Sequence, residues 1–147
     1  MSTTPFLSAF RGSFKNMLRW EQLDALWATI RTQAHGQWYV YAVGEAVPAE
    51  PVDNDRLHTF LTELDALLHR EHEEDYCGIV YVDDPAQPGF IKVYDPNNLG
   101  SVCGSGSQPP PLPGWVLCTM PPEDLPAAFP PPAARRRWWQ HLFGGAG

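Results

Sequence analysis

Six large apolar residues between positions 57 and 68 recur at steps of three and four, the spacing of one face of an α-helix. They are Leu57, Phe60, Leu61, Leu64, Leu67 and Leu68. The preceding segment 53–55 supplies side-chain oxygens that can cap a helix, and the pattern ends near His72. Because such a face has to be buried, the rest of the chain must provide a layer for it to pack on.

A second helix is predicted over residues 14–34. Apolar residues from Phe14 to Ile30 follow the same period, with Ser13 as a suitable N-cap and Gly36 as a suitable end. Residues 1–12 read as a loose lead-in whose apolar side chains can pack onto the folded domain.

Four segments are rich in β-branched and aromatic residues, as strands are: 38–43, 79–82, 90–94 and 115–119. The first is apolar at both alternating positions, which indicates a central strand covered on both faces. The second and third flank a loop containing Pro85, Pro88 and Gly89, so they are expected to form an antiparallel hairpin.

The resulting order, α-β-α-β-β-β, predicts an α+β fold. We expect a two-layer domain in which two amphipathic helices pack on a mostly antiparallel four-stranded sheet. The domain is expected to occupy residues 1–125. Residues 126–147 are predicted to be a Pro-rich linker that holds a basic, aromatic C-terminal peptide away from the domain.

Segment 95–114 begins with Asp95–Gly106, which is rich in glycine and asparagine and is followed by prolines. A connection of about twenty residues without regular structure is usually either functional or mobile, and both alternatives stay open. It places Asn97, Asn98 and Cys103 where a partner or a reagent can reach them.

The net charge of −7 is unevenly distributed, because residues 1–134 hold all 17 acidic residues and only seven of the ten cations. An acidic body argues against nucleic-acid binding. The three cysteines are an odd number at wide spacings and favour a reducing, cytoplasmic location. No apolar run reaches the length of a membrane span, so no transmembrane segment is expected.

The C-terminal peptide contains Arg136, Trp138, Trp139 and Phe143. Exposed aromatic residues usually have a binding site, and three are considered: the body of the same chain, a groove on another protein, or a membrane interface that gives weak peripheral contact. The acidic run from Glu71 to Asp75 is either a solvated helix end or a docking patch, for which the cationic tail is one candidate partner.

Helical steps also place His58, Asp65, His69 and His72 on one flank of the leucine-rich helix. Nitrogen and sulfur ligands suit zinc, so one alternative is a metal site formed by His69, His72, Cys77 and Cys103. No compact zinc motif supports it. Cys77 and Cys118 are expected to be small buried residues.

These observations favour a small soluble accessory protein over an enzyme, and no cofactor is expected. A protein partner would be recognised through segment 95–114, an aromatic face and the C-terminal peptide. The binding residues predicted are Asn97, Asn98, Cys103, Trp38, Tyr41, Arg136, Trp138, Trp139 and Phe143. The alternative is a thiol- or metal-dependent enzyme centred on Cys103, with a histidine of the second helix as base or ligand.

Overall fold

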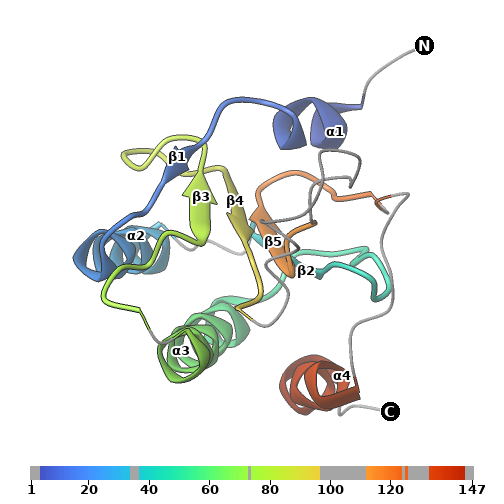
Figure 1. The fold of residues 1–147 in the computed structure, drawn as a ribbon. Coiled ribbons are helices and arrows are strands. Elements are labelled where there is room, and N and C mark those ends of the chain that lie inside the picture. Colours follow the sequence, from blue (N-terminus) through green and yellow to red (C-terminus); the bar gives the residue numbers. More distant parts are fainter. Residues whose placement is uncertain are drawn as a thin grey trace, which may run out of the picture.

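A computed structural model describes residues 4–33, 37–72, 74–96, 112–123, 125 and 133–144 (Figure 1). The elements in chain order are α1 (Pro5–Phe10), β1 (Lys15–Asn16), α2 (Trp20–Thr32), β2 (Tyr39–Ala42), α3 (Asn54–Glu71), β3 (Val80–Val82), β4 (Phe90–Val93), β5 (Trp115–Cys118), α4 (Ala133–Trp139) and the π-helical turn η1 (Gln140–Gly144). The α+β class is confirmed, and the predicted order runs from α2 to β5. None of the helices in the described residues is long and apolar enough to cross a membrane.

The sheet is antiparallel and open, with the strand order β1-β3-β4-β5-β2. The predicted count of four strands is wrong because β1 adds a fifth. A two-residue strand is too short to leave an alternating pattern in the sequence. The register sets one continuous apolar row across the other four strands, and its members are Val82, Ile91, Leu117 and Val40.

Strand β2 was expected in the centre of the sheet, and that expectation is wrong. It pairs with β5 and forms one edge of the sheet as the described strands build it. The sequence was misleading because both faces of β2 are nevertheless covered. Val40 and Ala42 belong to the main core, whereas Tyr41 belongs to a second cluster on the opposite face.

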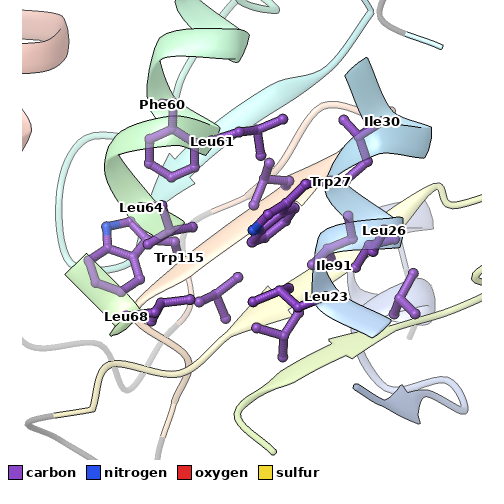
Figure 2. Packing of buried hydrophobic residues seen from close by; sticks show 14 of the residues in the cluster. Leu23, Leu26, Trp27, Ile30, Phe60, Leu61, Leu64, Leu68, Ile91 and Trp115 are labelled. Atoms are coloured by element: carbon purple, nitrogen blue, oxygen red, sulfur yellow. The ribbon is translucent and has the colours of Figure 1, made fainter. Parts of the chain in front are cut away.

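The main core lies between the sheet and the two long helices (Figure 2). Helix α2 contributes Leu23, Leu26, Trp27 and Ile30, and α3 contributes the six residues of its apolar face. All of these side chains are at most 2% exposed. Full burial of each large apolar side chain stabilises the fold by about 1.5–3 kcal/mol. This need for burial accounts for the apolar residues at helical spacing within α2 and α3.

The opposite face of the sheet is also covered, so the two-layer description is incomplete. Helix α1 lies on this side (Figure 1), where Phe6 is fully buried with its ring centroid 5.4 Å from that of Phe90. Lys92 of the central strand β4 sits 4.2 Å and 4.1 Å from the ring centroids of Phe10 and Phe14. Burial lowers the pKa of the Lys92 amine.

The predicted helix 14–34 begins too early. Residues 15–16 instead pair with β3, and the backbone N–H of Met17 donates to the Val80 carbonyl at 2.8 Å. Phe14 packs on Phe90 in the second cluster while Met17 enters the main core, so their helical spacing arose from two different faces of the sheet. Ser13 is not the cap, since α2 starts at Trp20. The predicted end, with Gly36, lies outside the described residues.

Candidate functional site

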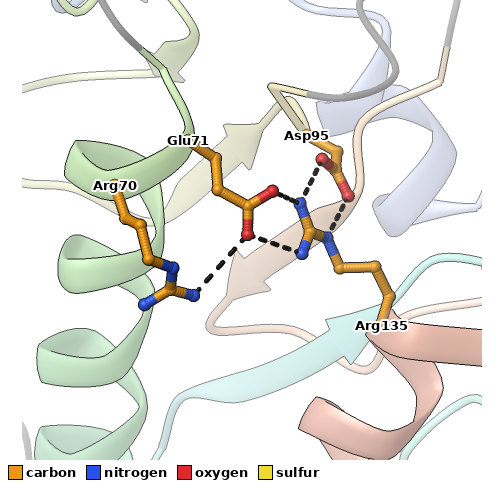
Figure 3. A network of polar contacts seen from close by, with 4 residues as sticks. All are labelled: Arg70, Glu71, Asp95 and Arg135. Carbon is orange, nitrogen blue, oxygen red and sulfur yellow. Dashed lines mark hydrogen bonds and ion pairs between the residues drawn. The ribbon is translucent and has the colours of Figure 1, made fainter.

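The C-terminal helix α4 is attached to the body by a largely buried ion network around Arg135 (Figure 3). Its Nε donates to Asp95 Oδ2 at 2.7 Å, and its Nη2 donates to Asp95 Oδ1 at 3.0 Å. The same guanidinium donates from Nη1 and Nη2 to the two oxygens of Glu71, at 3.0 and 2.6 Å. Hydrogen bonds to Asp95 and then to Glu71 raise the pKa of Arg135, so the group stays charged.

Arg135 therefore joins α4 to two segments that are far away in the sequence, the end of α3 and the chain that follows β4. Its side chain and that of Asp95 are each only 12% exposed, and Glu71 is 22% exposed. Glu71 is the last residue of α3 and the first residue of the acidic run. Through its hydrogen bonds to Arg135, this residue of the run binds the cationic tail. A buried charge needs such partners, because removing either carboxylate leaves the guanidinium poorly solvated.

The aromatic residues of α4 extend this contact into the main core. The Trp138 ring packs edge-on against Trp115 at 5.5 Å and lies 6.1 Å from Phe60. Trp139 packs edge-on against Phe60 at 6.1 Å, and Leu142 also lies against the cluster. Of the three locations considered for this peptide, the structure shows the one on the body of the same chain.

The other side of α4 and of the turn η1 that continues it is polar and faces solvent. Arg136, Arg137, Gln140 and His141 are all exposed, and we call these four residues the basic strip. The Arg136 side chain is 52% exposed, and its Nε lies 3.7 Å from Glu45 Oε2. At that distance the contact is a loose ion pair and leaves the guanidinium available to another carboxylate.

Segment 95–114 leaves and rejoins the body beside Arg135. At its far end Gly114 lies so close to Asp95 that a Cβ added to this glycine would be 3.2 Å from the Asp95 Cβ. The Gly114 N–H donates to the Val93 carbonyl, and its own carbonyl accepts from Val43. The two ends of the segment therefore meet next to the start of α4.

The structure places the predicted binding residues in different environments. Trp38 is 1% exposed in the main core, and Tyr41 is fully buried in the second cluster, where its hydroxyl accepts from the Leu125 N–H at 3.4 Å. Neither offers a surface to a partner in this conformation. Asn97, Asn98 and Cys103 lie outside the described residues, as does the side chain of Phe143.

Two residues of the predicted metal set meet, but through a backbone group. His72 Nε2 donates to the carbonyl of Cys77 at 2.8 Å, which fixes the turn between α3 and β3. The Cys77 thiol is buried, and desolvation raises its pKa, so little thiolate is present at neutral pH. His69 stacks on Trp20 with 4.0 Å between ring centroids, and the His72 ring lies edge-on at 6.1 Å from the same indole.

Three important positions were not selected from the sequence. Arg135 is one of three consecutive arginines, and only the phase of α4 distinguishes the buried one. Asp95 was noted as the start of a turn-rich stretch, not as an ion-pair partner. Asp24, whose carboxylate lies within 4.8 Å of potential ligand atoms of Asp65 and His69, gave no signal, because an exposed aspartate on a helix ordinarily faces only solvent.

Comparison with known proteins gives no further assignment: no family model, no curated protein and no solved structure matches the chain.

Proposed function

We propose that this protein is a binding module that recognises an acidic surface on a protein partner through its C-terminal helix and the adjoining segment 95–114. The observation that carries the proposal is the way α4 is docked. Arg135 and the two tryptophans hold one side of the helix on the body, and the basic strip is left facing solvent.

The charge distribution supports an acidic partner. The three arginines of 135–137 are the only cations after residue 92, and every acidic residue lies before them. A partner surface of negative charge is repelled by the body and attracted by the basic strip, which would orient the encounter. Because Asp95 and Gly114, the two ends of segment 95–114, lie beside Arg135, we include this segment in the proposed binding surface.

The packing of α4 favours a protein partner over a membrane surface. Binding at a membrane interface requires an apolar side that enters the lipid. The side chains of Trp138 and Trp139 of α4 and of Leu142 of η1 are in contact with the main core. These residues would become available only after the ion pairs of Arg135 with Glu71 and Asp95 had broken and the helix had left the body.

The test is partner recovery with the full-length protein immobilised and exposed to an extract of its source cells. The partners bound by the wild type should be rich in acidic surface and should be released by salt. We expect the double variant Arg136→Gln/Arg137→Gln to reduce their recovery at least tenfold. The matched control is Arg11→Gln/Arg56→Gln, which removes the same charge from two exposed residues elsewhere.

Equal recovery by both double variants would contradict the proposal. Binding of the wild type to anionic phospholipid vesicles, with no protein recovered, would favour the membrane instead. Cys103→Ser should leave partner recovery unchanged. If this variant no longer recovered the partner, the result would favour the thiol-dependent alternative.

A further inference from the structure

A second group of potential ligands lies where the two long helices α2 and α3 meet. Asp24 of α2 meets Asp65 and His69 of α3, and one potential ligand atom from each lies within 4.8 Å of the other two. His69 Nε2 is 3.5 Å from Asp65 Oδ1. The Asp65 and His69 side chains are 31% and 46% exposed, so an ion can enter from solvent.

These separations suit a shared metal ion. Zinc binds histidine nitrogen and carboxylate oxygen at about 2.0–2.2 Å, so two such ligands at a tetrahedral angle lie about 3.3–3.5 Å apart. The observed distance between Nε2 and Oδ1 agrees with that value, whereas a direct hydrogen bond between them would be shorter. Asp24 is exposed, and its carboxylate already lies within 4.8 Å of the ligand atoms of Asp65 and His69.

Two tryptophans hold the ligands in place. The indole N–H of Trp27, a residue only 2% exposed, donates to Asp65 Oδ1 at 3.1 Å. Trp20 stacks on the His69 ring, and its own indole N–H donates to the Glu74 carbonyl at 3.1 Å. Such outer contacts fix the orientation of metal ligands and reduce the entropy lost on binding.

The charge balance also points to a cation. Two carboxylates approach one another here, yet neither forms an ion pair with a lysine or arginine among the described residues. Two arginines of the same helices have other partners: Arg31 donates to Thr62, and Arg70 pairs with Glu71. The third member, His69, offers a ring nitrogen that can share an ion with the two carboxylates.

We propose that Asp24, Asp65 and His69 form a binding site for a divalent cation of the zinc class. Three ligands from two helices leave one coordination position for water or for a donor from another molecule. The site differs from a histidine–cysteine site, because it shares only His69 with the set His69, His72, Cys77 and Cys103. It is also independent of the basic strip.

The test is titration of untagged, chelator-treated, full-length protein with ZnCl₂ by calorimetry and with CoCl₂ by visible absorption. We expect saturable binding of one equivalent, at least tenfold weaker in His69→Gln and in Asp24→Asn. The matched control is His58→Gln, which removes another exposed histidine from the same helix and should bind like the wild type. The three substituted residues, Asp24, His58 and His69, are exposed, so the variants should keep the circular dichroism spectrum of the wild type.

Asp24→Asn separates this site from the histidine–cysteine alternative. The proposal would be overturned if Asp24→Asn bound the metal ion normally while Cys103→Ser lost it. It would also be overturned if His69→Gln bound the ion as well as the wild type, or if the wild type showed no saturable binding. An independent readout is NMR: Co²⁺ should first broaden the indole N–H signals of Trp20 and Trp27, assigned with Trp20→Phe, and leave the Trp115 signal sharp.

Discussion

The environment of individual buried residues controls how this protein responds to pH, and Cys118 is the clearest case. Its thiol donates to the Met120 carbonyl at 3.2 Å, and burial raises its pKa from 9.0 to about 12. Above pH 9 the unfolded chain loses this proton and the folded chain keeps it. The free energy of unfolding should therefore fall by up to about 1.4 kcal/mol per pH unit between pH 9 and 12.

Urea unfolding from pH 8 to 10.5 measures this effect. Cys118→Ser retains a donor for the Met120 carbonyl but has no group that ionises in this range, so its stability should fall less steeply than that of the wild type. Parallel curves for the two proteins would show that Cys118 does not supply the pH dependence. Buried Cys77, whose pKa is also raised, acts in the same direction and remains in both.

Prediction at the residue scale succeeded where chemistry alone was decisive. Cys77 and Cys118 were expected to be buried among apolar neighbours, and both are. The sequence also suggested that the acidic run meets the cationic tail, as Glu71 and Arg135 do. It could not choose Arg135 over its two neighbours, because that choice depends on which side of α4 faces the core.

At the scale of elements, local capping sets where the leucine-rich helix begins. The carboxylate of Asp53 accepts the Arg56 N–H at 2.7 Å. Asp53→Ala should reduce the free energy of unfolding by about 1 kcal/mol, because it leaves this helical N–H without its cap. Glu63→Ala, an exposed substitution in the middle of the same helix, is the control and should change stability by less than about 0.5 kcal/mol. Equal effects in urea unfolding would argue against the cap.

The accuracy of the predicted elements follows the physical origin of each pattern. The period of α3 arises from one face packed on one core, and the helix was located nearly residue for residue. The pattern before α2 combined residues from both faces of the sheet, so the predicted helix absorbed β1. Strand β2 was found, but its place in the sheet depends on pairing with β5, which no local pattern records.

At the scale of the whole molecule, Arg135 couples the C-terminal helix to the body. Arg135→Gln should reduce the free energy of unfolding by about 3 kcal/mol, the lower end for breaking a buried ion pair, because Glu71 keeps some contact with water. Arg137→Gln removes an exposed arginine from the same helix and should cost less than about 0.5 kcal/mol. Urea unfolding compares the two.

Adding Glu71→Gln to Arg135→Gln should recover part of the loss, since one uncompensated carboxylate is removed with its partner. If Arg135→Gln is no more destabilising than Arg137→Gln, the ion network does not hold the helix in solution. The overall α+β class needed only periodicity and composition, whereas this long-range coupling needed the fold itself.

The pairing of β2 with β5 also bears on how the chain is made. Tyr39 lies opposite Cys118 in the finished sheet, so β2 is synthesised long before the strand that completes its hydrogen bonds. While the intervening segment emerges from the ribosome, the backbone of β2 can be satisfied only by water or by a chaperone. Long-range strand pairing of this kind is slow, and it delays completion of the sheet until the C-terminal half has been translated.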